Sequence, residues 1–177
     1  MVSDPILDFF EVIIPRVGAI HFWHYVLLLF RHIYIVIINI RFLGPAPKSV
    51  LIFLDSAYKE VFQKNFPLYY EFFYRLCGRK LAHIYNYNNV KIGFALFRTG
   101  PKENIHLCSM GIINNFRGQG LSKPLLSKSL AFWKQEGFKT SSLYVENTNV
   151  IAIKTYASLG YQSIKYIDDM IYMSITL

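Results

Sequence analysis

Two patterns of hydrophobic and polar positions divide this chain near residue 45. Residues 18–43 are almost continuously apolar, whereas from Ser49 onward apolar residues recur with the periods of helices and strands. Between the two patterns lies Gly44-Pro45-Ala46-Pro47, which interrupts regular structure and is the best linker candidate. The pattern therefore predicts a hydrophobic segment over residues 1–44 and one folded domain over residues 45–177.

The hydrophobic segment is long enough to cross a bilayer, which takes roughly 20 apolar residues. Arg31 and His32 lie in its middle, however, and an Arg there costs about 2.5–3.5 kcal/mol on insertion scales. Three interpretations stay open: a helix or hairpin lying on a membrane, a poor transmembrane span, or a first layer of the folded domain. A cleavable signal is not expected, because Asp4, Asp8 and Glu11 replace its basic region.

The folded domain is predicted to be α/β. Helical spacing over residues 49–81, broken by Pro67, predicts two helices. A short strand at residues 83–87 and a hairpin of two longer strands, 90–98 and 105–113, should follow. The remaining elements, in order, are a helix that ends near Gly137, a strand over residues 142–146, a helix between Asn149 and Gly160, and a hairpin of residues 161–167 and 170–177. The strands on either side of the first of these helices form a crossover unit, so they should lie parallel in the sheet.

The turn between the strand at residues 105–113 and the next helix is the strongest candidate for chemistry. Gly118 and Gly120 have no Cβ, so they allow positive φ and a close approach of a ligand to the main chain. The helix that follows offers first-turn N–H groups without intrahelical acceptors and a dipole that favours an anion. Arg117 and Lys123 flank the turn with positive charge. This pattern predicts a phosphate-binding site.

The turn also resembles a known family. Arg117, Gly120 and Ser122 follow the acetyl-CoA signature of the GCN5-related N-acetyltransferases (GNAT), which reads Arg or Gln, two residues, Gly, one residue, and Gly or Ala; Ser departs from it in the last position. A second block resembles the family pattern N-x-x-A-x-x-x-Y-x-x-x-G followed by an aromatic residue, and it consists of Asn149, Ala152, Tyr156, Gly160 and Tyr161. Two blocks in the right order are far more specific than either alone. The resemblance covers roughly residues 48–177.

The resemblance implies a GNAT-like mixed central sheet with flanking helices and a splayed parallel strand pair that admits a thioester. It implies that acetyl-CoA is the cofactor and that its acetyl group moves to a primary amine. The pyrophosphate would lie on the turn, and the N–H groups near Ile112 and Ile113 would polarise the carbonyl. The residues expected to bind the cofactor are Ile112, Ile113, Arg117, Gly118, Gln119, Gly120, Leu121, Ser122, Lys123 and Asn149.

Two side chains are predicted to be catalytic. Tyr156 matches the family position whose hydroxyl protonates or hydrogen-bonds the CoA sulfur; its alternative is a core aromatic residue. Asn149 matches a position that contacts the cofactor and could equally serve only as a helix cap. Many relatives use a Glu as base on the strand before the turn, but no acid lies in that strand here. His106 is therefore predicted as the base, with a near-neutral pKa, and water or a tyrosine of residues 69–74 are the alternatives. Cys108 lacks the adjacent base that an acyl carrier needs.

Composition narrows the choice of partners. The formal charge is +8, and residues 1–44 balance three Arg against three acids, so the whole excess lies in the folded domain. This excess favours an anionic partner, and the phosphates of CoA would suffice. No helix carries a dense stripe of Lys and Arg, so nucleic acid is not expected as a partner. The hydrophobic fraction of 53% indicates a large core or an apolar surface that meets a membrane or a partner.

Cysteine usage and the apolar segment bear on location and acceptor. Cys77 and Cys108 are the only cysteines, without a CxxC motif or zinc spacing, so we expect two free thiols in the reducing cytoplasm and no metal site. The apolar segment points to work at or near a membrane, on a small-molecule, glycan-linked or lipid-linked amine. Two rival classes stay open: a non-catalytic acyl-CoA-binding domain that has lost its base, and a membrane-anchored interaction protein. Neither the acceptor nor the oligomeric state follows from the sequence.

Overall fold

The computed structural model describes residues 46–77 and 80–177. The hydrophobic segment over residues 1–44 lies outside the described residues, so its three interpretations stay predictions. Every described element belongs to the unit Ile38–Leu177. None of the described helices is long and apolar enough to span a bilayer.

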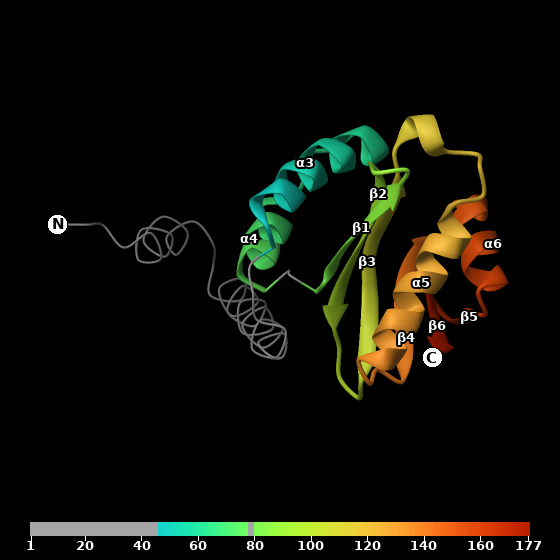
Figure 1. Cartoon of the computed structure of the whole chain (residues 1–177). Helices are drawn as coiled ribbons and strands as arrows, with labels where there is room; N and C mark the ends of the chain where they lie inside the picture. Colours follow the sequence, from blue (N-terminus) through green and yellow to red (C-terminus); the bar gives the residue numbers. More distant parts are fainter. Residues whose placement is uncertain (1–45, 78–79) are drawn as a thin grey trace, which may run out of the picture. The chain divides into compact units, whose positions relative to one another are not determined.

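One six-stranded sheet with helices on both faces forms the domain (Figure 1). The elements, in chain order, are α3 (Lys48–Phe62), α4 (Leu68–Cys77), β1 (Ala82–Tyr87), β2 (Val90–Thr99), β3 (Asn104–Ile112), η3 (Asn114–Phe116), α5 (Ser122–Gln135), β4 (Thr140–Glu146), α6 (Val150–Ser158), β5 (Gln162–Ile167) and β6 (Met170–Thr176). The strand order is β1-β2-β3-β4-β6-β5, in which β3 and β4 are parallel and the other described neighbours are antiparallel. Helices α3 and α4 lie on one face of the sheet, and α5 and α6 lie on the other (Figure 1). The predicted α/β class, mixed sheet and parallel pair are confirmed.

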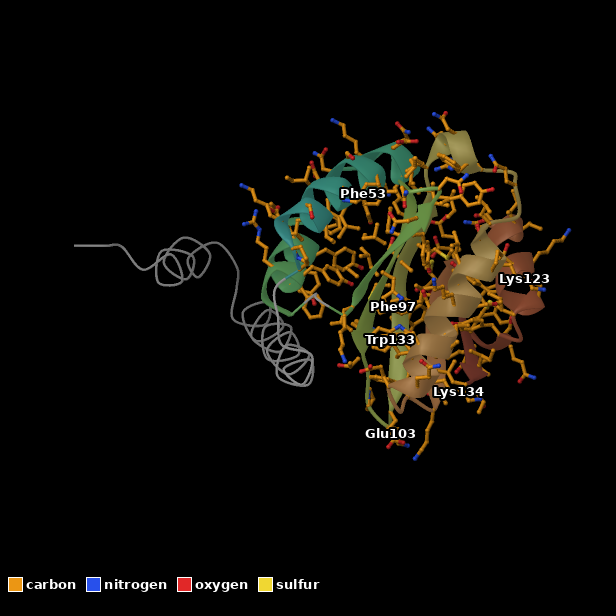
Figure 2. All side chains as sticks on the ribbon, in the orientation of Figure 1. Phe53, Phe97, Glu103, Lys123, Trp133 and Lys134 are labelled. Carbon is orange, nitrogen blue, oxygen red and sulfur yellow. The ribbon has the colours of Figure 1, made fainter. Side chains whose placement is uncertain are left out.

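Aromatic packing fixes α5 on the sheet. Phe97 of β2 and Trp133 of α5 are both fully buried, with ring centroids 5.5 Å apart, and Figure 2 shows them between the sheet and the helix. His83 of β1 stacks on Trp133 at 5.2 Å with an interplanar angle of 13°. Truncating a buried aromatic residue of this size to Ala typically costs about 3–5 kcal/mol. This layer therefore holds the C-terminal end of α5 against the sheet.

Local chemistry sets the helix boundaries. Helix α3 is followed by Gln63 in the left-handed conformation (φ 55°), and Pro67 precedes α4, as predicted. Helix α6 begins after Asn149, whose side-chain oxygen accepts a hydrogen bond from the N–H of Ala152 at 3.1 Å. The predicted N-cap at Asn149 is confirmed.

The parallel pair β3–β4 separates halfway along its length. Residues 104–107 of β3 pair with residues 140–143 of β4, and beyond them the two strands continue without pairing to each other. In the β2–β3 ladder the register shifts between Leu96 and Phe97, so that Cys108 is an extra residue opposite no partner. Such a bulge bends its strand and increases the local twist. Because it directly follows the last residue paired with β4, the bulge gives a physical reason for the predicted splay, which is confirmed.

Candidate active site

The turn before α5 has the backbone that its glycines predict. Gly118 has φ of 74° and Gly120 has φ of 69°, both in the left-handed region. A Cβ built at either position would meet no atom within 4 Å. These glycines are therefore favoured by the backbone conformation, because an L residue with a side chain costs roughly 1–2 kcal/mol in the left-handed region. Steric crowding does not require them.

The main-chain N–H groups of this turn are available to a ligand. From Gly118 to Lys123, none of them donates to a backbone carbonyl of the described residues. The N-terminus of α5 also has no side-chain cap, and its first described backbone bond outside the regular ladder runs from the N–H of Leu125 to the oxygen of Leu121 at 3.2 Å. Consecutive unpaired N–H groups at the positive end of a helix dipole form an anion-binding arrangement.

Arg117 fastens this turn to the rest of the domain. Its Nε donates to the carbonyl oxygen of Ile112 at 2.9 Å, and its Nη2 donates to that of Val61 at 3.3 Å. On the other side of η3, the N–H of Asn114 donates to Oε1 of Glu60 at 2.6 Å. These contacts tie the turn to β3 and α3, so the structure gives Arg117 a positioning role. Its direct contact with an anion stays a prediction, as does that of the exposed Lys123.

The edge of β3 that faces the gap carries one of the two predicted carbonyl donors. The N–H of Ile113 donates to the oxygen of Ile92 at 2.9 Å, so it is already used in the sheet. Successive residues of an antiparallel strand direct their N–H groups to opposite edges. The N–H of Ile112 therefore faces the side on which β4 has separated, as does its carbonyl, which accepts from Arg117. Of the two candidates, only Ile112 offers its N–H to the gap.

Tyr156 lies on α6 with its ring 5.8 Å from that of Tyr161. Burial raises the pKa of the Tyr156 hydroxyl to about 12, so it is protonated at neutral pH. Within the described part of the chain, this hydroxyl has no hydrogen-bond partner, unlike that of Tyr161, which contacts Oγ of Ser141 at 2.7 Å. A protonated, unengaged hydroxyl is the state that a proton donor needs.

His106 lies on the opposite face of the sheet from α5. It is 7% exposed, and its Nδ1 lies 2.9 Å from Oγ of Ser142. Ser142 donates its own hydrogen to Oδ1 of Asn104 at 2.9 Å, and Nδ2 of Asn104 donates to Oγ1 of Thr140 at 2.9 Å. Because the Ser142 hydrogen is used, Nδ1 of His106 must be the donor to it. The chain of hydrogen bonds fixes the tautomer in which Nε2 is the acceptor.

The prediction of a near-neutral pKa for His106 is wrong. Burial first, and the positive charge of Arg98 second, lower the pKa of His106 to about 3. Arg98 is directly opposite His106 in the β2–β3 ladder, so the imidazolium form would face a like charge. A histidine with so low a pKa is neutral at working pH and is a weak base. It can accept a hydrogen bond from an amine, but it does not readily remove a proton from an ammonium group.

Two other side chains on this face stay protonated as well. Burial raises the pKa of Tyr70, which disfavours the tyrosine alternative for the base. Burial also raises the pKa of Cys108 to about 12, although the positive charge of Arg98 and a hydrogen bond from it oppose the shift. A thiol with that pKa is inert as a nucleophile, so the structure disfavours an acyl-cysteine step.

The acid nearest to these side chains along β4 is Glu146, which the sequence pattern does not single out. It is an exposed residue at the end of β4, and the alternation of a strand places it on the same face as Ser142 and Tyr144. An acid was expected only on β3, whereas the strand parallel to β3 ends with one. No group of three His, Cys, Asp or Glu side chains in residues 46–77 and 80–177 is placed to hold a metal ion.

The predicted site residues therefore divide between the two faces of the sheet at the gap; below, the side of a pair of helices means the face of the sheet that those helices cover. The turn, Ile112 and Tyr156 belong to the side that carries α5 and α6, whereas His106 belongs to the side that carries α3 and α4. A ligand bound in the gap would contact the turn, Ile112 and Tyr156 from the face of α5 and α6. A second molecule would approach that ligand from the face of α3 and α4.

Several solved structures share this fold. Naa50 of Arabidopsis thaliana, solved with a bisubstrate analogue, is 20% identical; the match covers 76% of this chain and 97% of that one, with a TM-score of 0.62. Ard1 of Thermoplasma volcanium is 13% identical, with 76% and 96% covered and a TM-score of 0.64. PaiA N-acetyltransferase of Thermoplasma acidophilum, solved with coenzyme A, is 13% identical, with 73% and 92% covered and a TM-score of 0.55. At these identities the likeness shows the fold alone.

The sequence comparison establishes the family. No curated sequence matches the chain. A profile of the acetyltransferase (GNAT) family matches residues 51–161, which include both the turn before α5 and the whole of α6. The chain therefore belongs to the acetyltransferase (GNAT) family.

Proposed function

We propose that this protein transfers the acetyl group of acetyl-CoA to a primary amine. The observation that carries the proposal is the gap between β3 and β4 with unpaired N–H groups at its mouth. The gap opens beside Cys108, and the turn from Gly118 to Lys123 follows the end of β3. A long ligand that carries a phosphate group would occupy the gap and the turn at the same time.

The turn fits the diphosphate of CoA. Within the described residues, its N–H groups are unpaired and no side chain occupies the space at Gly118 or Gly120, and Lys123 is exposed beside them. Asn149 uses its side-chain oxygen as a cap, which leaves its amide N–H groups for the pantetheine arm. Acetyl-CoA supplies the thioester, and the protein supplies the binding and the proton for the departing sulfur.

Two groups would act on the thioester. The N–H of Ile112 faces the gap and would stabilise the negative charge that develops on the carbonyl oxygen during attack. Tyr156 holds its proton at neutral pH and would give it to the departing sulfur. The acceptor nitrogen would form the new bond to the carbonyl carbon as the bond to sulfur breaks. The proton that the nitrogen then loses would pass to water, and Tyr156 would regain its proton from water.

Deprotonation of the amine is assigned to solvent. Neither His106 nor Tyr70 has a pKa that suits a base at neutral pH, and Glu146 lies beyond Tyr144 at the far end of β4. We therefore propose that the amine enters in its neutral form or loses its proton through water. The rate of acetyl transfer should then rise with pH up to the pKa of the acceptor amine. The pH–rate profile should show no titration of His106 between pH 5 and 8.

A two-part experiment tests the proposal with the full chain. Calorimetric titration with acetyl-CoA measures binding, and release of free thiol in the presence of a panel of amines measures transfer. Panel members should include peptides with a free N-terminus and small primary amines. Binding with no thiol release on any amine would favour the non-catalytic alternative. Absence of binding would overturn the assignment of the turn.

A further inference from the structure

A row of polar side chains crosses the sheet on the face opposite α5. The strand registers place Arg98 of β2 opposite His106 of β3, His106 opposite Ser142 of β4, and Ser142 opposite Ser174 of β6. Residues directly opposite each other share a face, with Cβ atoms about 4.5–5.5 Å apart. The neighbouring pair Phe97–Leu107 faces the other way, because Phe97 packs on Trp133 of α5. The row therefore lies on the face of α3 and α4, immediately before the gap begins.

The side chains around Arg98 are neutral. His106 has lost its charge, Cys108 keeps its proton and shares a side-chain hydrogen bond with Arg98, and burial keeps the nearby Tyr70 protonated. Tyr58 of α3, also kept protonated by burial, hydrogen-bonds to Ser109 on the same face. These neighbours, all from the described part of the chain, therefore do not compensate the charge of the guanidinium.

No acid among the described residues forms an ion pair with Arg98. The ion pairs of the described chain join Arg75 to Glu71, Lys80 to Glu136 and Lys139 to Glu103. Glu146 is on the same face of the sheet but lies beyond Tyr144, towards the far end of β4. Arg98 is only half-exposed, and a partly desolvated charge without a counter-ion is costly unless a ligand supplies one.

We propose that the acceptor amine also carries a carboxylate or phosphate group, and that Arg98 binds this group while the amine enters the gap. The proposal rests on the proposed function, because it assumes that the amine approaches from the face of α3 and α4. A guanidinium presents parallel N–H donors that match the two oxygens of a carboxylate or phosphate. Nε2 of His106, held as an acceptor by the Ser142 contact, would receive an N–H of the same molecule. Arg98 would thus determine specificity, and it takes no part in the chemical step.

Matched pairs of amines test this proposal with the full chain. One series compares ω-amino carboxylic acids of increasing length with their amides, and a second compares ethanolamine phosphate with ethanolamine. The charged member of at least one pair should have a kcat/KM at least about tenfold higher. The first series distinguishes a carboxylate from the phosphate of the second, and its best chain length reports the spacing between Arg98 and the thioester. Equal efficiencies within every pair would overturn the proposal.

Three variants test whether the preference for the charged amine depends on Arg98. Arg98→Gln should abolish the preference and leave the affinity for acetyl-CoA unchanged, whereas Arg98→Lys should retain part of it. Lys134→Gln removes the same charge from an exposed position on α5, on the other face of the sheet (Figure 2), and should behave as the parent. A preference that survives in a folded Arg98→Gln protein would refute the proposal.

A binding measurement separates this inference from the proposed function. If no amine is acetylated, the same pairs can be titrated into the CoA-loaded protein and followed by its melting temperature. Stabilisation by the charged members alone, lost in Arg98→Gln, would support the anion site even though the transferase assignment had failed. If neither member of any pair stabilises the protein, the anion site is refuted as well.

Discussion

The two sides of the gap are built by different means. On the side of α5 and α6, the functional groups come from short stretches of sequence: a turn of six residues with two glycines, and one helix with its cap. On the side of α3 and α4, they come from residues far apart in sequence that the register of β2, β3 and β4 brings together. The first side can be recognised from sequence motifs, whereas the second depends on strand pairing that no motif records. The cofactor side is therefore formed by residues that are close in sequence, whereas the acceptor side is formed by residues that only strand pairing brings together.

The largest expected effect is on the cofactor side, at Gly120. Gly120→Val should weaken acetyl-CoA binding more than about 100-fold, because Val disfavours φ of 69° and its Cβ enters the space where the ligand meets the main chain. Calorimetric titration measures the loss. Gly137→Val is a matched control, since Gly137 has φ of 90° and equal open space but lies after α5. Equal affinity in the two variants would show that the turn is not the binding site.

Tyr156 sharpens the comparison at the level of chemistry. Tyr156→Phe should lower kcat by about 100-fold and leave the affinity for acetyl-CoA unchanged, because only the proton of the hydroxyl is lost. Steady-state kinetics with a saturating amine measures the effect. Tyr161→Phe removes the neighbouring hydroxyl, which is bonded to Ser141, and should reduce stability by about 1 kcal/mol without a change in kcat. If kcat fell equally in both variants, Tyr156 would have no special role.

The acceptor side can be tested through its response to acid. The pKa of His106 is lower in the folded protein, about 3, than its ordinary value of 6.5, so the unfolded chain binds the extra proton as pH falls. The stabilisation is complete above pH 6.5 and is lost progressively towards pH 3, at about 1.4 kcal/mol per pH unit. Between pH 7.5 and pH 5, the contribution of His106 should therefore fall by about 2 kcal/mol. Urea unfolding of the parent and of His106→Gln at both pH values measures the difference, and parallel losses in the two proteins would contradict it.

The smallest expected effect separates the two roles of Asn149. Asn149→Ala should destabilise the protein by about 1 kcal/mol, because the bond from the N–H of Ala152 is lost, whereas Asn149→Ser keeps a cap of similar strength. Thermal unfolding measures the difference between the two variants. If Asn149→Ser still lowers the affinity for acetyl-CoA, the side chain also contacts the cofactor. Unchanged affinity would leave Asn149 as a cap alone.

The sequence was sufficient for the fold because periodicity and turn chemistry act locally. Pro67, the glycines of the turn and the crossover helix each fix a boundary or a direction, and the structure follows them closely. The splay followed from the resemblance, but its cause did not, since the bulge at Cys108 is visible only when β2 and β3 are paired. Sequence alone also could not give the pKa of His106, which depends on burial and on Arg98 across the ladder. The role of Arg117 was missed for the same reason, because its acceptors lie on β3 and at the end of α3.

The short paired stretch between β3 and β4 has a mechanical consequence. Among the residues that the structure describes, only 104–107 and 140–143 join the antiparallel half β1-β2-β3 to the antiparallel half β4-β6-β5 within the sheet. This seam is held by few ladder bonds, each worth about 0.5–1.5 kcal/mol net. A ligand that binds between β3 and β4 and hydrogen-bonds to both strands would replace the missing ladder bonds. Amide protons of β3 and β4 should therefore exchange more slowly with solvent deuterium when the seam is bridged, while those of the hairpin β5–β6 keep their rates.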